Sequence, residues 1–309
     1  MGLYVLLPLV LPLSAWPVAR LAAPRLHPRT ATRLLTRVAA VLGGSSTLCL
    51  ALLTVVGSAQ LTGSPVPDEW ADPEFRAAVS RDRVAGRAAI PALGLVAAAC
   101  GRTLWRHRRV ARRARQALTG LRAAPVVVLP DTTPYAFALP GSHDRIVVTT
   151  ALLDGLAPDE RRALFAHERA HLAARHHRHL LTVHLAACAN PFLRPLRSAV
   201  AYTAERWADE DAARVVGDRR VVARAIGKAA LLSSAPPAPT LAAVAAVGPV
   251  PRRVAALLAP APADRPWPSA FTAVGAAVWG AAAGAVVSAV SSANSAVTLF
   301  LLLHPAAPL

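Results

Sequence analysis

Two histidines and a glutamate in the stretch FAHERAHLAARHH, residues 165–177, have the types and spacing that metal-dependent hydrolysis requires. His167 and His171 are four residues apart, so on a helix both imidazoles lie on one face and can bind one cation. Glu168 lies one position further round the helix, beside that cation. Its carboxylate could take a proton from an attacking water and pass it to a leaving amine. This is the chemistry of the H-E-x-x-H pattern of zinc peptidases.

A catalytic zinc site normally has a third protein ligand and one open position. The stretch AERWADEDA, residues 204–212, offers Glu205 as that ligand. Asp209 lies on the same helical face and could accept the outer N–H of a ligand histidine. Asp209 as the ligand, with Glu205 behind it, is the alternative. An acidic pair at this spacing usually lies on the solvated surface of a helix. Here the pair follows H-E-x-x-H after a gap long enough for one helix, and the two motifs together predict a Zn²⁺ site.

The remaining polar side chains near these motifs carry weaker predictions. The other histidines of this region are expected to be solvated or interfacial rather than bound to the metal. A donor for the transition-state oxyanion is also needed, and Tyr202, several histidines and several arginines are candidates. The histidines in question are His176, His177, His179 and His184.

Short strands and helices must position these residues. PVVVLP, PYAFALPG and DRIVVTT are typical of three strands and predict a small antiparallel sheet. Pro158 suits the first turn of a helix that carries the histidine pair and is expected to reach His177. An apolar helix, buried or interfacial, should end at Asn190, and the acidic helix should end at Gly217. The strands are expected at residues 125–130, 134–141 and 144–150, the helices at 156–177, 180–193 and 198–218, and a loop at 233–240.

The composition indicates a membrane protein. Of the residues, 54% are hydrophobic and 17% are charged, and the mean hydropathy is +0.41. Four uncharged or nearly uncharged runs could each cross a bilayer, the first of them irregular because it contains three prolines. We therefore expect an α-helical multi-pass membrane protein with about four spans and an α+β zincin-like metallopeptidase domain. The spans are predicted near residues 1–19, 38–61, 87–105 and 266–303, with an acidic external loop at 65–75.

The net charge of +17 is nearly all arginine, and its distribution gives an orientation. Arginine blocks at residues 20–37 and 102–122 flank the spans and should be cytoplasmic under the positive-inside rule. Both termini should then lie outside, with the active site on the cytoplasmic side of a bacterial cell membrane. This topology divides the chain into a three-span region (1–105), a cytoplasmic zinc metallopeptidase domain (106–265) and a final span with a short external tail (266–309).

Two other classes of function are disfavoured. The basic residues lie beside apolar runs, and no aromatic-and-basic platform accompanies them, so no nucleic acid is expected as a partner. The lipid bilayer and a protein or peptide substrate are the expected partners. Cys49, Cys100 and Cys188 are odd in number and far apart in sequence, which argues against a disulfide framework or a cysteine zinc site.

These motifs together resemble those of a known family. LFAHERAHLAARHH, preceded by YAFALPG and DRIVVTTALLDGLAPDERRA and followed by AERWADEDAA, is similar to the BlaR/MecR-type membrane zinc metallopeptidases. These are the protease parts of beta-lactam sensor-transducers and their shorter bacterial relatives. The resemblance implies a gluzincin site in which His167, His171 and Glu205 bind zinc, Glu168 is the general base and Asp209 supports a ligand histidine. HtpX-type membrane proteases share both motifs and are the alternative within this class.

One departure from the family bears on function. The beta-lactam receptors carry a large external penicillin-binding domain after their last span, whereas this sequence ends at Leu309, so a short form without the sensor is expected. The prediction is a membrane-bound zinc endopeptidase that cleaves a protein substrate near the cytoplasmic face, in signalling or regulated proteolysis. The rivals are an HtpX-type quality-control protease and a scaffold that keeps the zinc fold with little turnover. A transporter is disfavoured because no intramembrane charge pair stands out.

Overall fold

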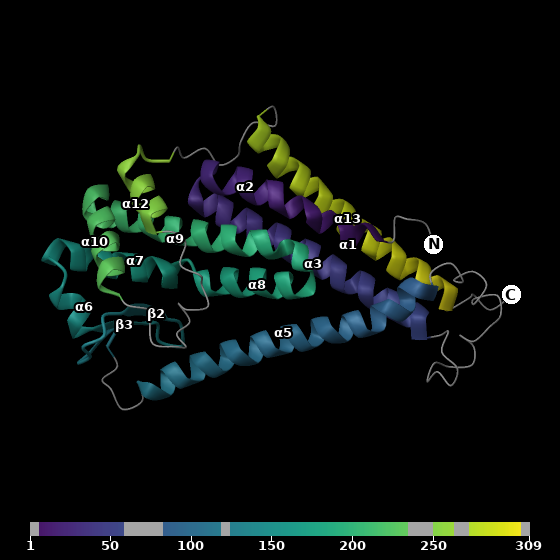
Figure 1. Ribbon diagram of the computed structural model, residues 1–309, viewed down its shortest axis with the longest axis horizontal. Helices are drawn as coiled ribbons and strands as arrows, with labels where there is room; N and C mark the ends of the chain where they lie inside the picture. Colours follow the sequence, from purple (N-terminus) through teal and green to yellow (C-terminus); the bar gives the residue numbers. More distant parts are fainter. Residues whose placement is uncertain (1–5, 59–82, 119–123, 234–249, 263–271, 304–309) are drawn as a thin grey trace.

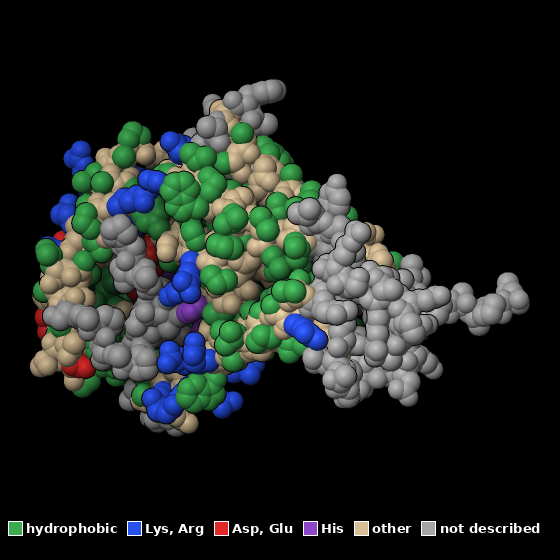
Figure 2. Space-filling model, turned by 45° about the vertical axis from the view of Figure 1, so that its right-hand side comes forward, with side chains coloured by type: hydrophobic (Ala, Val, Ile, Leu, Met, Phe, Trp, Pro, Cys, Tyr) green, Lys and Arg blue, Asp and Glu red, His purple; other side chains and the backbone are tan. Residues whose placement is uncertain are grey.

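The computed structural model describes residues 6–58, 83–118, 124–233, 250–262 and 272–303. Most of these residues are helical, and Figure 1 shows long helices extending from a compact end that holds the small sheet. Four helical stretches are long and apolar enough to cross a membrane: Leu7–Arg25, Pro28–Val55, Val84–Ala117 and Gly275–Thr298. The four expected runs therefore all form such helices. On the face drawn in Figure 2, hydrophobic side chains dominate the middle, and most Lys and Arg side chains lie in its left half.

The first apolar run is irregular, as its prolines predict. A proline has no backbone N–H and favours the beginning of a helical segment, and here the run divides into short pieces before a longer helix forms. The pieces are α1 (Leu7–Val10), the 3₁₀ turn η2 (Leu11–Ser14) and α2 (Ala15–Arg25).

The other three apolar runs form long helices whose ends differ from the predicted spans. Helix α3 (Pro28–Ser58) begins about one turn after α2 and includes Arg29, Arg33 and Arg37, three of the arginines that were expected to precede the span. Helix α5 (Arg83–Ala117) likewise continues through the basic block, because arginine is a good helix former and its long side chain can reach water from the helix surface. Helix α13 (Ala273–Leu303) is the last. The predicted external loop at residues 65–75 lies outside the described residues.

The three predicted strands form, but the sheet is mixed rather than antiparallel. Strands β1 (Val126–Leu129), β2 (Ala136–Leu139) and β3 (Arg145–Thr149) lie in the order β1-β3-β2. β3 pairs antiparallel with β2 and parallel with β1. The prediction of an antiparallel sheet was wrong because β3, whose residues 146–149 are all buried, takes the central position. Because the outer strands β1 and β2 run in opposite directions, a strand between them must be parallel to one of the two.

The helix that carries the histidine pair is shorter than predicted. After the short α6 (Thr150–Asp154), α7 runs over Pro158–Ala173 and α8 over His176–Ala189. Between them Arg175 adopts a left-handed conformation with φ of 52°. Such a conformation is usual for glycine and rare for arginine. Because no glycine or proline stands at this turn, the sequence gives no sign of it. The prediction of one helix reaching His177 was therefore wrong.

The remaining helices pack the site against the long apolar helices. α8 ends at Asn190 as predicted and leads through the turn η5 (Pro191–Leu193) into α9 (Arg194–Val216), which ends at Gly217 with φ of 82°. α10 (Arg219–Leu232) and α12 (Val250–Leu258) follow. The loop predicted at 233–240 lies almost wholly outside the described residues. One hydrophobic cluster joins α2, α3, α8, α9 and α13, so the helices of the site and the apolar helices share a core.

Candidate active site

Helix α7 is positioned by a charged network at its first turn. The carboxylate of Glu160 accepts a hydrogen bond from the Ala157 backbone N–H at 2.9 Å, which satisfies one of the unpaired amides at a helix start. The same carboxylate lies 2.8 Å from the Lys228 ammonium of α10. Asp159 pairs with Arg224 of α10 at 3.3 Å. These contacts fix the direction in which α7 enters the core, and so where its histidines point.

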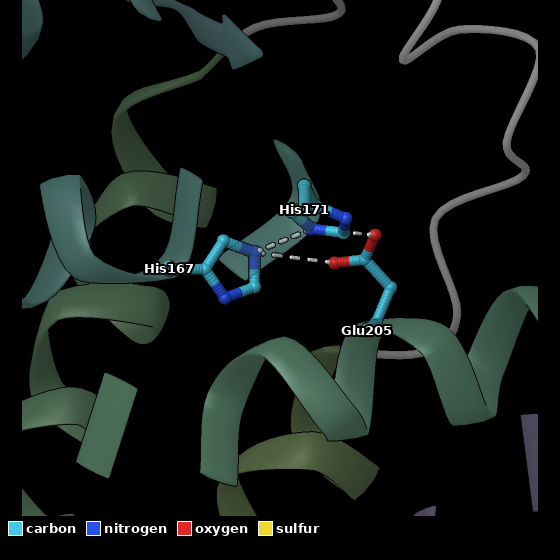
Figure 3. Close-up of side chains that lie close together, drawn as sticks. All are labelled: His167, His171 and Glu205. Carbon is cyan, nitrogen blue, oxygen red and sulfur yellow. Dashed lines mark hydrogen bonds and ion pairs between the residues drawn. The ribbon is translucent and has the colours of Figure 1, made fainter. Parts of the chain in front are cut away.

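Three side chains from two helices converge at the centre of the site (Figure 3). His167 and His171 project from α7 with their Nε2 atoms 3.0 Å apart. Glu205 projects from α9, and its carboxylate oxygens lie 3.5 Å from His167 Nε2 and 3.4 Å from His171 Nε2. Among the described residues this is the group of His, Cys, Asp and Glu side chains whose donor atoms could together hold a metal ion.

The donor set fits zinc. Two imidazole nitrogens and a carboxylate oxygen are a known ligand set of catalytic zinc sites, which leave a fourth position open. In a tetrahedral site with bonds of about 2.0–2.1 Å, neighbouring donor atoms are roughly 3.3–3.4 Å apart. The separations of 3.0, 3.4 and 3.5 Å here are close to that value. The ligand roles of His167, His171 and Glu205 stay a prediction, and the structure places the three donors where such an ion needs them.

Asp209 lies where it was expected, behind His167. Its Oδ1 is 3.0 Å from His167 Nδ1, and the carboxylate is fully buried. With Nε2 directed at the metal position, Nδ1 carries the proton and donates to Asp209, which fixes the orientation of the ring. Burial acts to lower the pKa of His167, but Asp209 and Glu205 outweigh it and raise that pKa to about 10. A cation bound at Nε2 would have to replace a proton that these carboxylates favour.

His176 supports the second histidine in a similar way, which the sequence did not predict. The side chain is buried, with 1% exposed, and its Nδ1 lies 2.8 Å from His171 Nδ1. Because the Nε2 of His171 faces Glu205, its Nδ1 holds the proton and donates to His176. Burial lowers the pKa of His171 to about 4, so its ring is neutral and can bind a metal. The expectation that His176 is solvated or interfacial was wrong, because the turn at Arg175 directs it inward.

Arg253 is the second residue that sequence analysis missed. It comes from α12, is 5% exposed, and its guanidinium bonds both oxygens of Asp209 at 2.9 and 2.6 Å. It also lies 2.8 Å from Glu205 Oε2. Burial opposes ionisation of Glu205, but Arg253 and His171 hold the pKa of that carboxyl well below its usual range. One buried cation therefore keeps two carboxylates of the site charged and fixed in place.

Glu168 lines the same cavity as the metal-binding group. Its carboxylate accepts a hydrogen bond from the backbone N–H of Ala138 in β2, so the sheet helps to orient it. Burial raises the pKa of Glu168 above its usual range, despite the nearby His167. A carboxylate with a raised pKa is a better proton acceptor near neutral pH. The catalytic role of Glu168 itself stays a prediction.

A pair of histidines, a glutamate from a second helix and a carboxylate in one cavity form the kind of site found in metallopeptidases. Comparison with known families gives the same class: residues 101–186 match the model of Peptidase family M48. The matched part contains His167, Glu168 and His171 and ends before α9, so Glu205 and Asp209 lie outside it. This match supports an M48-type metallopeptidase. Among curated proteins and among solved structures, no match to this chain was found.

Proposed function

We propose that the protein is a membrane-bound, zinc-dependent endopeptidase that hydrolyses a protein substrate near the cytoplasmic membrane face, in regulated proteolysis. The observation that carries the proposal is the convergence of His167, His171 and Glu205 on one point, beside Glu168, in a single cavity. The family match supports the peptidase class. An HtpX-type role in quality control would use the same chemistry and differ in the substrate.

In the proposed reaction, bound zinc would polarise the scissile carbonyl and make the attacking water more acidic. Glu168 takes the proton of that water and returns it to the leaving amine. Asp209 and His176 hold the two ligand imidazoles through their Nδ1 protons, so the Nε2 atoms stay directed at the metal position. Arg253 keeps Glu205 ionised and therefore able to bind a cation.

The positions of two arginine blocks support the proposed side of the membrane. The guanidinium carbons of Arg29 and Arg33, at the start of α3, lie 5.6 and 5.2 Å from the ring centroid of Trp207, which is two residues after Glu205. At the other block, Arg115 of α5 donates to the carbonyl of Pro140 beside β2 at 3.1 Å. Both basic blocks thus lie at the end of the molecule that holds the site. By the positive-inside rule this end is cytoplasmic.

A substitution of the general base tests the proposal. The full-length chain and its Glu168→Gln variant would be purified in detergent, their zinc content measured, and cleavage of labelled casein and of the chain itself followed with and without a chelator. We expect both proteins to bind zinc, and the variant to lose about 10²–10⁴-fold in rate.

Arg162→Gln, at an exposed position on the same helix, is the matched control and should cleave within roughly two-fold of the wild type. Cleavage by Glu168→Gln at the wild-type rate, or a wild-type protein that neither binds zinc nor responds to the chelator, would show that the proposal is wrong. Zinc binding without turnover in the wild type would favour the scaffold alternative.

A further inference from the structure

The cavity of the active site has two ends of different chemistry. It has a volume of about 570 Å³ and extends from the metal-binding group in two directions. Towards α10 its wall is apolar, formed by Val222, Ala225, Ile226 and Ala229. Towards α5 and the beginning of α9 its wall includes Arg102, Arg106 and Arg197. In Figure 1, α10 lies at the left end of the molecule, and α5 and α8 extend from the site in the opposite direction.

The three arginines are brought to the cavity by packing that the structure fixes. Arg102 and Arg106 are four residues apart and share one face of α5. Both are exposed, and the adjacent Thr103 contacts α8, where its Oγ1 lies 3.5 Å from Cys188 Sγ. Arg197 reaches the same end of the cavity from the first turn of α9.

Within the part of the chain that the structure describes, these arginines have no acidic partner, unlike Arg206 and Arg219. Among the described residues, none of Arg102, Arg106 and Arg197 forms an ion pair, whereas Arg206 and Arg219 both pair with Glu210. On the face drawn in Figure 2, Lys and Arg side chains gather beside a histidine with few acidic side chains near them. An unpaired cationic wall in a partly enclosed cleft raises the local concentration of anions and disfavours cations.

We propose that the substrate is a polypeptide with an acidic residue on one side of the scissile bond and an apolar residue on the other, and that Arg102, Arg106 and Arg197 select the acidic residue. This inference rests on the proposed peptidase function. A peptide is the occupant that the structure favours over a lipid headgroup, because the arginines line the same cavity as Glu168, Tyr135 and residues 136–138 of β2. A chain that lies along this cavity with its reacting bond at Glu168 would contact both walls.

The test uses the full-length protein in nanodiscs and compares charge at one substrate position. A peptide library is first digested with the wild type and with Glu168→Gln, and the bonds cut only by the wild type define the preferred positions. Matched peptides with Glu, Gln or Lys at the acidic position are then compared. We expect kcat/KM to fall about ten-fold from Glu to Gln and further from Gln to Lys. The double variant Arg102→Glu/Arg106→Glu should reverse this order.

Control variants, folding checks and a comparison of lipids keep the result interpretable. Arg109→Glu lies on the same helix but outside the cavity lining, and it should keep the wild-type order. Zinc content and thermal stability check that each variant is folded, and Arg197→Gln provides a milder change that should weaken the preference for Glu. All measurements are repeated in nanodiscs of neutral and of anionic lipid.

Cleavage that depends on Glu168 and zinc but ignores the charge of the peptide would overturn this inference and leave the proposed function standing. Arginine variants that change activity only in anionic nanodiscs, with an unchanged order among the three peptides, would also overturn it, since the arginines would then bind lipid headgroups. Absence of any Glu168-dependent cleavage would remove the proposed function and this inference together.

Discussion

At the scale of single residues, Arg253 connects two carboxylates that the site needs in ionised form. We expect Arg253→Lys to lower zinc affinity and peptidase rate by about 10–100-fold, since an ammonium cannot reproduce the forked bonds to Asp209 while also contacting Glu205. Arg252→Lys changes the exposed neighbour on the same helix and should leave both quantities near the wild-type values. Competition with a chromogenic chelator measures the affinity, and an unchanged affinity in Arg253→Lys would contradict this role.

The residues of the site show how much of it could be predicted from the sequence at this scale. His167 and His171, and likewise Glu205 and Asp209, could be paired because residues four apart share a helical face. Arg253 is 44 residues from Asp209 and is one of 34 lysines and arginines, with no motif to distinguish it. Its role depends on where α12 packs, which is a property of the folded chain.

At the scale of elements, the first turn of α7 depends on the ionised carboxylate of Glu160. Burial opposes that charge, but Lys228 and the Ala157 amide outweigh it and hold the pKa of Glu160 below its usual range. A lowered folded-state pKa means that the stabilisation is present above the unfolded-state value of about 4.3 and is lost as the pH falls through the folded-state value.

We therefore expect Glu160→Gln to lower the free energy of unfolding by about 1 kcal/mol near pH 7. This difference from the wild type should shrink as the pH falls below about 4.3. Thermal unfolding of both proteins in detergent between pH 3 and 7 measures it. Asp144→Asn, on an exposed turn, is the control and should show little difference at any pH. A constant difference between Glu160→Gln and the wild type across the whole range would show that the charge is not the cause.

Elements were predicted better than their order and their ends. The three strands lie within the predicted segments, because β-branched runs bounded by proline and glycine are a local signal. The central place of β3 follows from burial of residues 146–149, which depends on the helices that cover it. The turn at Arg175 has no local signal, and so neither the end of α7 nor the inward position of His176 could be predicted.

At the scale of the whole molecule, α3 approaches α8 at a glycine. A Cβ added to Gly43 would lie 3.0 Å from both Cα and Cβ of Ala186, which is closer than ordinary packing allows. We expect Gly43→Leu to separate the two helices, lower the free energy of unfolding by about 1–3 kcal/mol and reduce peptidase activity, because α8 carries His176.

Gly44→Leu is the matched control, since a Cβ at the adjacent position meets nothing within 4 Å. Thermal unfolding and casein cleavage in detergent compare the two variants. Equal behaviour of Gly43→Leu and Gly44→Leu would show that this contact does not connect the apolar helices to the site.

The four apolar helices themselves could be predicted from hydropathy. The contact between Gly43 and Ala186 could not, because a single glycine in the sequence does not indicate which residue it packs against.

The hydrophobic cluster that joins α9 to the apolar helices limits how the protein can be divided. Leu196 and Val200 are buried in it. Thr203, only two residues before Glu205, accepts a 3.0 Å hydrogen bond from Thr32 of α3. A fragment excised at residue 106 to obtain a water-soluble enzyme would leave this face bare and prone to aggregate. Preparative work should therefore begin from intact chains, with α9 still packed against its hydrophobic neighbours.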